Sequence, residues 1–256
     1  MQPTRGKLIK ENSASIPYIW HVSKRHKMVL LCLHGFAGDK DSSVIAALLE
    51  GLDETGVGVV SFDWPAHGES PASDHSLTVE NALADLSYVI GWIKSQVSVP
   101  IACFATSFGG YLAILFRNQN PDAFFRLTLR SPALNMKEVF RRLLTDNEYE
   151  LIIRGETVEM GFERKMQIGK PFFKSLCRND AFALEPPRPE EILVLQGDKD
   201  LVVDPSDTKN YTQINGIKLV LFEATDHYYK RPGEKERIVS VTKDYLEESG
   251  LSRNRK

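Results

Sequence analysis

The chain has 256 residues, of which 42% are apolar and 26% charged, and its formal net charge at pH 7 is −2. This length and apolar content suffice for one large buried core. A nearly neutral chain without a basic patch gives no reason to expect a nucleic-acid partner. No apolar run in the sequence approaches the roughly 18 residues that a membrane-spanning helix needs.

The number and spacing of the cysteines indicate the cellular compartment of the protein. Cys32, Cys103 and Cys177 are an odd number and lack the spacing of a disulfide framework or of a metal site. The first seven residues are polar, unlike a secretory leader. We therefore expect a cytoplasmic protein that uses no metal and no organic cofactor, and the sequence leaves a homodimer open.

Apolar runs alternate with helical stretches along most of the chain. Residues 7–10 and 16–22 predict an opening antiparallel hairpin, and the clearest helix covers 79–97, where Leu83, Leu86 and Ile93 recur at helical spacing. Six further runs predict parallel strands: 28–33, 57–62, 99–104, 125–129, 191–195 and 217–222. The expected fold class is α/β, a doubly wound and mostly parallel sheet, in which ligands bind beyond the carboxyl ends of the strands.

The alternation stops after the sixth strand. Residues 1–133 and 190–256 would form the core, and residues 134–189 an inserted cap over the strand ends. The inserted segment predicts a helix at 136–144, a hairpin-like stretch at 150–160 and a second helix near 170–176. Its aromatic residues could line a substrate pocket or form a small core of the cap itself; the pocket candidates are Tyr149, Phe162 and Phe172.

Ser107 is the candidate nucleophile. It lies in Ala105-Thr106-Ser107-Phe108-Gly109, between an apolar strand and a helical run, where a sharp turn would expose its hydroxyl and leave free backbone N–H groups beside it. Small residues two positions before and two after the serine give that turn the room it requires. The pentapeptide alone is also compatible with an ordinary strand end, so the hypothesis depends on its partners.

An acid and a base follow in the expected chain order. The strand at 191–195 leads to Asp198 and Asp200, and we choose Asp200 because the apolar residues 201–203 directly after it would pin its loop against the core. Asp198 is predicted to be a turn residue instead. His227 follows the last predicted strand and is the candidate base.

A glycine-rich turn after the strand 28–33 predicts an oxyanion site. The backbone N–H groups of Phe36 and of Phe108, the residue after the nucleophile, are the natural donors for a developing negative charge, each worth roughly 3–4 kcal/mol. His34 is expected to brace this turn rather than to react.

These stretches together resemble the α/β-hydrolase superfamily. His34-Gly35-Phe36 is similar to its oxyanion turn, residues 63–70 to its D-x-x-G-x-G-x-S loop, and Ser107, Asp200 and His227 to its catalytic triad. Phe36, the Gly38-Asp39-Lys40 that follows and the insertion are most similar to bacterial cinnamoyl (feruloyl) esterases and carboxylesterases of the monoacylglycerol lipase type. Two positions depart from the pattern: Ala105 replaces a glycine, and Ala66-His67 alters the second loop, which leaves His67 open between bracing that loop and lining the site entrance.

The resemblance implies a serine carboxylesterase. It would hydrolyse a small or medium ester with an apolar or aromatic acyl group, hydroxycinnamoyl included, through an acyl-enzyme. Thioesters and amides pass through the same kind of intermediate, so a thioesterase or an aminopeptidase of the same superfamily is the alternative. An aminopeptidase would need an acidic anchor in the cap, for which Glu148, Glu150 and Glu163 are candidates. A hydrolase-like binding protein without turnover is the remaining alternative.

Overall fold

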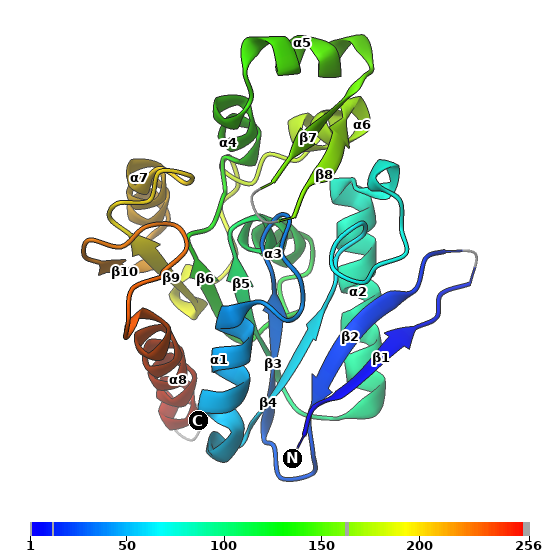
Figure 1. Cartoon of the computed structure of the whole chain (residues 1–256). Helices are drawn as coiled ribbons and strands as arrows, with labels where there is room; N and C mark the ends of the chain where they lie inside the picture. The colour runs from blue at the N-terminus through cyan, green and yellow to red at the C-terminus, as the bar shows by residue number, and fades with distance from the viewer. Residues whose placement is uncertain (1, 12, 162–163, 253–256) are drawn as a thin grey trace.

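An eight-stranded sheet forms the centre of the computed structural model, which describes residues 2–11, 13–161 and 164–252 (Figure 1). The strands lie in the order β1-β2-β4-β3-β5-β6-β9-β10. The first two strands pair antiparallel with their neighbours and the remaining pairs are parallel. Their bounds are β1 Thr4–Leu8, β2 Ile16–His21, β3 Met28–Leu33, β4 Val57–Phe62, β5 Ile101–Thr106, β6 Leu127–Arg130, β9 Ile192–Gly197 and β10 Lys218–Phe222. The expected α/β fold class is confirmed.

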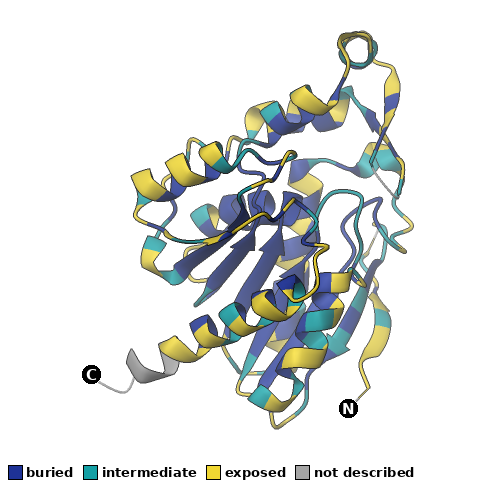
Figure 2. Cartoon of the chain, turned by 60° about the vertical axis from the view of Figure 1, so that its left-hand side comes forward, coloured by how far each residue is buried: buried dark blue, intermediate teal, exposed yellow. Residues whose placement is uncertain are grey.

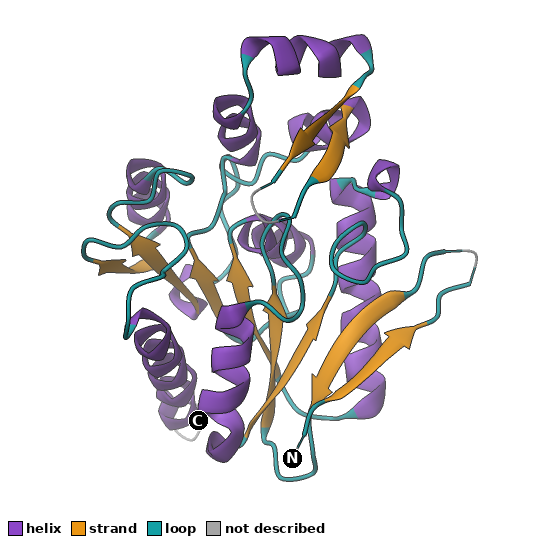
Figure 3. Ribbon diagram, in the orientation of Figure 1, coloured by secondary structure: helices purple, strands orange, loops and turns teal. Residues whose placement is uncertain are grey.

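Helices cover both faces of this sheet, as Figure 3 shows. The pair α1 (Ser43–Leu52) and α8 (Glu234–Ser252) packs on one face, and the pair α2 (Val79–Gln96) and α3 (Phe108–Gln119) on the other. Helix α7 (Pro205–Asn215) lies beside β9 and β10. Short 3-10 turns occupy Asp53–Thr55, Asp74–Ser76 and Pro189–Glu191.

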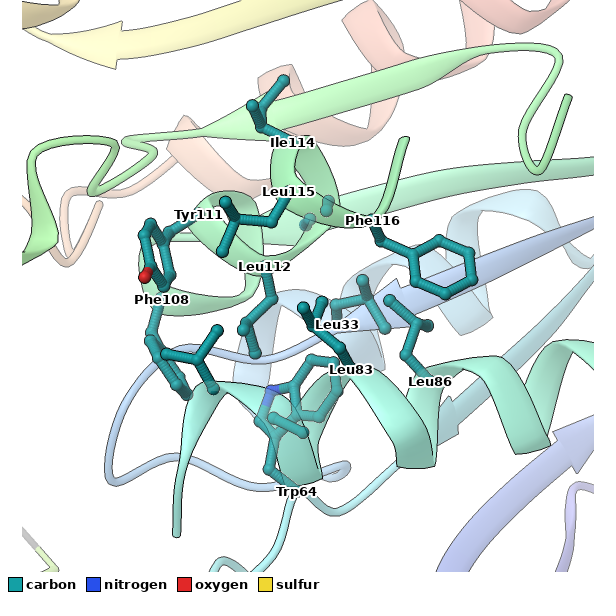
Figure 4. Close-up of a cluster of buried hydrophobic side chains, with 14 of the residues drawn as sticks. Leu33, Trp64, Leu83, Leu86, Phe108, Tyr111, Leu112, Ile114, Leu115 and Phe116 are labelled. Carbon is teal, nitrogen blue, oxygen red and sulfur yellow. The ribbon is translucent and has the colours of Figure 1, made fainter. Parts of the chain in front are cut away.

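The central strands are buried along their whole length, which explains their continuous apolar sequence (Figure 2). On the α2–α3 face, Leu33 of β3 meets Leu83 and Leu86 of α2 and Leu112 of α3 (Figure 4). This packing fixes the start of α3 against the end of β3. The Ser107 turn and the glycine-rich turn therefore lie on one rigid support.

The segment between β6 and β9 rises beyond the carboxyl ends of the parallel strands (Figure 1). It contains α4 (Met136–Leu143), α5 (Asp146–Arg154), a two-stranded sheet of β7 (Thr157–Met160) and β8 (Met166–Gly169), and α6 (Lys170–Arg178). No helix in the described part of the chain is long and apolar enough to cross a membrane.

The hairpin-like interpretation of residues 150–160 is wrong in its first half, where the chain continues α5. Thr145 and Glu148 form a reciprocal capping box at the start of this helix, and Gly155 ends it in the left-handed region at φ 98°. These local signals outweigh the β-branched Ile152 and Ile153. The strand β7 then pairs antiparallel with β8, not with the stretch before it.

Candidate active site

Ser107 occupies a strained turn between β5 and α3. Its φ of 50° and ψ of −112° lie outside the helical and extended regions, a strain that structures retain mainly at functional positions. Gly109 is required there, because a Cβ atom would lie 2.6 Å from the carbonyl oxygen of His34. At position 105 the alanine that replaces the usual glycine is accommodated, fully buried, within β5. The turn therefore has the shape that a nucleophile elbow requires.

Asp200 and His227 are brought together at the same edge of the sheet, from the loops after β9 and β10. The Nδ1 atom of His227 lies 2.8 Å from Oδ2 of Asp200. The other carboxylate oxygen accepts the backbone N–H groups of Val202 at 2.9 Å and Val203 at 2.8 Å. A carboxylate only accepts, so Nδ1 carries the proton and Nε2 of His227 is left with the lone pair of a base.

The Asp200 carboxyl stays ionised although it is buried. Burial alone would raise its pKa, but the hydrogen bond and charge of His227 and the N–H of Val203 outweigh burial, so the pKa lies below its ordinary value. The apolar stretch after Asp200 pins the loop only in part: Val203 is buried, whereas Leu201 is 96% exposed. Asp198 instead accepts the N–H of Thr225 at 3.3 Å, which is a turn role.

The glycine-rich turn passes directly beside Ser107. A Cβ atom on Gly35 would lie 3.4 Å from the Cβ atom of Ser107, which is van der Waals distance, so the turn lies directly against the serine. Phe108 is the first residue of α3, and its N–H is one of those that a helix start leaves without an intrahelical acceptor. The rings of Phe36 and Phe108 lie 6.2 Å apart, edge to face. Both oxyanion candidates thus border the serine.

His34 braces the turn with both ring nitrogens. Its Nδ1 lies 2.8 Å from the Gly35 carbonyl oxygen, and its Nε2 accepts the N–H of Trp64 at 3.2 Å. Burial lowers the pKa of His34 to about 4, so the ring is neutral. His67 is also buried and neutral, with its pKa lowered to about 3 by burial, and its Nδ1 donates to the Pro65 carbonyl at 2.9 Å. Its position supports the bracing role.

A buried ion pair ties the glycine-rich turn to the loop at 63–70. Asp63 accepts the backbone N–H of Lys40 at 2.8 Å and the Lys40 ammonium at 3.0 Å, and Glu69 accepts the same ammonium at 3.0 Å. Burial disfavours the charged ammonium, but these hydrogen bonds outweigh it and raise the pKa of Lys40. Gly68 is required because a Cβ atom there would lie 2.2 Å from the Asp63 carboxylate.

The three pocket candidates of the inserted segment differ in position. Phe172 is buried, with its ring 6.1 Å from that of Phe36 and 6.0 Å from that of Phe108, so it borders the candidate oxyanion site. Tyr149 lies farther into the segment, against Phe173 at 5.8 Å and below the guanidinium of Arg141. Phe162 lies outside the described residues.

Polar contacts on two sides fasten the inserted segment to the core. Arg164 donates to the carbonyl oxygens of Gly68 at 2.6 Å and of Ala66 at 3.0 Å. On the opposite side, Arg142 of α4 pairs with Asp207 of α7 at 3.2 Å. The segment is therefore held over the strand ends from both sides.

The described residues offer one group suited to a metal ion, and it lies where β2 ends, near the amino ends of the parallel strands and away from Ser107. His21 Nε2 is 2.6 Å from Asp53 Oδ1, with His26 nearby. The guanidinium of Arg25 lies 2.5 Å from the same carboxylate oxygen and would repel a cation. These three residues therefore do not indicate a metal-binding function.

Among the residues beside this site that sequence reasoning overlooked is Arg130. It ends β6, and its side chain reaches the carbonyl oxygen of His227 at 3.0 Å. The available signal was a charge at the end of an otherwise apolar predicted strand, where a buried arginine requires a partner.

The fold and this arrangement define an α/β serine hydrolase. The chain belongs to the serine aminopeptidase S33 family (Hydrolase_4), whose model matches residues 24–156. No curated protein sequence matches the chain significantly.

Solved structures share the fold at low sequence identity. Est1E from Butyrivibrio proteoclasticus, solved with ferulic acid bound, is 20% identical with a TM-score of 0.83 over 95% of this chain and 98% of that chain. Alpha/beta hydrolase domain-containing protein 10 from mouse is 15% identical with a TM-score of 0.79 over 96% and 99%. XC6422 from Xanthomonas campestris, described as a serine hydrolase without lid, is 16% identical with a TM-score of 0.68 over 96% and 94%.

Proposed function

We propose that this serine hydrolase is a carboxylesterase in which Ser107, His227 and Asp200 form the catalytic triad. The observation that carries the proposal is the pairing of His227 with a buried, ionised Asp200 at the sheet edge where the strained Ser107 turn also lies. That pairing leaves a lone pair on His227 Nε2, the atom that a general base of this kind uses.

The reaction proceeds in two steps. His227 takes the Ser107 hydroxyl proton as the oxygen attacks the ester carbonyl, and the resulting oxyanion accepts the N–H groups of Phe36 and Phe108. Collapse of the tetrahedral intermediate breaks the ester bond, and His227 gives its proton to the leaving alcohol. A water molecule then attacks the acyl-enzyme by the same route, which releases the acid and restores Ser107.

Residues 134–189 act as a cap subdomain that shapes the acyl site. Phe36 and Phe172 bring aromatic rings to the edge of the candidate oxyanion site, and Phe140 of α4 packs on both, 4.9 Å from Phe36 and 5.2 Å from Phe172. Such a cluster suits an apolar or aromatic acyl group. The fold shared with Est1E, whose structure has ferulic acid bound, supports a hydroxycinnamoyl ester as one such substrate.

The aminopeptidase alternative takes its support from the family's description. Two of its three candidate anchors for a substrate amino group are described. Glu148 is engaged in the capping box of α5, and Glu150 is exposed on the same helix. Neither has the buried position that a charged amino group would need for selective recognition. Glu163 lies outside the described residues.

The same triad would also allow thioester hydrolysis, and other features bear on the compartment and the partner. Thioester hydrolysis would follow the same two steps and is the closest variant of this activity. All three cysteines are free thiols, which supports a reducing, cytoplasmic compartment. The partner is a small-molecule ester, and a homodimer stays a prediction.

The test is a side-by-side comparison of kcat/KM on methyl hydroxycinnamates, short alkyl esters, aryl thioesters and aminoacyl amides, with Ser107→Ala as the control. We expect ester turnover that exceeds amide turnover by at least about 100-fold and disappears in the variant. Amide turnover equal to or above ester turnover would contradict the carboxylesterase proposal and favour the aminopeptidase.

A further inference from the structure

Gln196 is a polar residue in an otherwise apolar strand. The other residues of β9 are aliphatic residues and a glycine, and the side chain of Gln196 is fully buried among them. Burying an amide is costly unless its polar atoms find partners. Both polar atoms of this amide have partners, so the contacts of Gln196 indicate its role.

The amide nitrogen of Gln196 faces the loop that carries Asp200. Nε2 donates to the carbonyl oxygen of Gly197 at 3.1 Å, to Oδ2 of Asp200 at 3.1 Å and to the carbonyl oxygen of Val203 at 3.5 Å. Carbonyl and carboxylate oxygens only accept hydrogen bonds, so this end of the amide is the NH₂ group and not the oxygen. Gln196 thus binds both ends of the loop 197–203 and the carboxylate between them.

One carboxylate oxygen serves both Gln196 and the candidate base. Oδ2 of Asp200 accepts Nδ1 of His227 at 2.8 Å as well as Nε2 of Gln196, whereas Oδ1 is held by backbone N–H groups. The backbone bonds fix one oxygen and the Gln196 bond restrains the other, so the plane of the carboxylate does not turn freely. The orientation of that plane sets the orientation of the His227 ring.

Thr208 of α7 holds the opposite end of the amide. Its hydroxyl donates to Oε1 of Gln196 at 3.0 Å, and the threonine side chain is buried. Loss of this hydroxyl removes a donor from a buried acceptor, which favours any turn of the amide that finds another donor. A chain of three hydrogen bonds therefore leads from α7 through Gln196 and Asp200 to His227.

We propose that Gln196 is a positioning residue for the triad, which orients the Asp200 carboxylate toward His227 and is itself oriented by Thr208. This inference rests on the proposed function, since it assumes that the pair of Asp200 and His227 activates Ser107. Gln196 and Thr208 act through Asp200 and not on the substrate. Their loss should therefore lower kcat and leave KM nearly unchanged.

Four single variants test this chain of contacts. Gln196→Met keeps the length of the side chain and removes both polar atoms. Thr208→Val keeps the branched shape and removes the hydroxyl, whereas Thr208→Ser keeps the hydroxyl. Thr212→Val is the matched control: Thr212 is also buried on α7, but its hydroxyl donates to the carbonyl oxygens of Thr208 and Lys209 within the helix. Each variant is first checked for folding by circular dichroism and thermal melting.

The first measurement is the rate at which a fluorophosphonate modifies Ser107, which requires the triad but no particular ester. We expect Gln196→Met to react about 10–100-fold more slowly and Thr208→Val about 3–10-fold more slowly, since small displacements of a catalytic group have effects of that size. Thr208→Ser and Thr212→Val should match the wild type. Added to Gln196→Met, Thr208→Val should cause no further loss, because Thr208 acts through the amide.

The second measurement is the proton resonance of His227 Nδ1–H, observed by ¹⁵N-edited NMR on the resting protein at one fixed pH and assigned by its loss in His227→Gln. This resonance depends on the distance to Oδ2 of Asp200 and on the tautomer of the ring. It should move or broaden in Gln196→Met and Thr208→Val and keep its position in Thr208→Ser and Thr212→Val. A residue that only stabilises the fold would leave it unmoved below the melting temperature.

A folded Gln196→Met protein with the wild-type rate, or with a slower rate and an unmoved resonance, would overturn the inference. Equal losses from Thr208→Val with and without Gln196→Met would overturn it as well. If Gln196→Met does not fold, Thr208→Val decides: a slower rate and a moved resonance, both absent in Thr208→Ser, support the inference, and an unmoved resonance overturns it. Wild-type labelling at Ser107 without ester turnover would refute the esterase proposal alone. Absence of labelling would refute both.

Discussion

Asp200 holds His227 in one tautomer and one orientation through a carboxylate that accepts four hydrogen bonds. Oδ2 accepts from His227 Nδ1 at 2.8 Å and from Gln196 Nε2 at 3.1 Å, while Oδ1 is held by the backbone N–H groups of Val202 and Val203. The carboxylate is thereby fixed by the loop that carries it, and the imidazole is fixed by the carboxylate. The pair is preorganised before any substrate arrives.

Replacing this carboxylate by an amide should strongly reduce turnover. In Asp200→Asn the amide oxygen can keep the two backbone bonds, which turns the NH₂ group toward His227 Nδ1. Nδ1 must then accept, and the proton moves to Nε2, where it prevents the ring from acting as a base. We expect kcat to fall by about 10³–10⁴-fold in a protein that still folds.

Asp198→Asn is the matched control, two residues earlier in the same loop. Its amide oxygen can still accept the Thr225 N–H, so kcat should stay within about threefold of the wild type. If Asp198→Asn lost far more kcat than Asp200→Asn in the steady-state assay, the catalytic acid would be Asp198.

The ion pair of Lys40 with Asp63, which joins the glycine-rich turn to the loop at 63–70, depends on Gly68. Gly68→Ala places a Cβ atom 2.2 Å from the Asp63 carboxylate, at a φ of 53°. The carboxylate must move, which disturbs its bonds to Lys40. We expect a loss of about 3 kcal/mol in the free energy of unfolding and a lower kcat.

Gly216→Ala provides the comparison, because Gly216 has a similar φ of 65° with open space around it. This control should lose only the roughly 1–2 kcal/mol of left-handed strain and keep full activity. Urea unfolding of both variants checks the prediction. Equal losses in the free energy of unfolding would show that the contact with Asp63 does not add to the cost of Gly68→Ala.

The regular part of this fold was predictable because each buried parallel strand is a continuous apolar run. The strands at 28–33 and 57–62 have the predicted bounds, since both their faces are covered by helices. The opening strand was predicted at 7–10 but covers Thr4–Leu8, so it begins three residues earlier. Its mostly exposed residues give a weak apolar signal. Helix α5 was misread for a related reason: two adjacent isoleucines suggested a strand, whereas the capping box decided the structure.

The candidate site was predictable where chemistry and chain order coincide, as at Ser107, Asp200 and His227. Arg130 was not, because nothing in a single sequence tells which carbonyl a buried guanidinium will reach. The positions of Phe172 and Tyr149 were equally unpredictable: both are aromatic residues of the inserted segment, and only the packing of α6 brings one of them to Phe36 and Phe108. Long-range contacts of this kind depend on tertiary structure rather than on local pattern.

These different positions predict different effects on substrate preference. Phe172→Ala removes a ring beside the oxyanion site and should reduce kcat/KM for aryl-acyl esters more than for short alkyl esters, by about 10-fold. Tyr149→Ala removes a ring that contacts Phe173 and Arg141 within the inserted segment. It should lower the melting temperature and leave the ratio of the two kcat/KM values unchanged. Equal losses on both ester classes in Phe172→Ala would mean that Phe172 only stabilises the packing of the inserted segment.

Stability should fall on acidification because of two of the buried histidines, His34 and His67. Their folded pKa values, about 4 for His34 and about 3 for His67, lie below the ordinary value of 6.5. The unfolded chain therefore binds more protons below pH 6.5. The stabilisation is complete above that pH and is lost toward pH 4, at about 1.4 kcal/mol per pH unit for each histidine.

Urea unfolding between pH 7 and pH 4.5 checks this sign. His67→Gln keeps an N–H donor for the Pro65 carbonyl but cannot titrate, so its stability should depend less steeply on pH than that of the wild type. The exposed His75→Gln variant should follow the wild-type curve. Identical slopes in all three proteins would show that His67 does not contribute to acid sensitivity.

The central claim is that Ser107 is a nucleophile activated by His227. The most direct measurement is the intact mass of the protein after reaction with a fluorophosphonate, followed by peptide mapping of the modified residue. We predict one adduct per chain, on Ser107, formed by the wild type and by the surface variant Ser95→Ala and not formed by Ser107→Ala or His227→Ala. A folded wild-type protein that stays unmodified, or an adduct that persists in Ser107→Ala, would contradict the account.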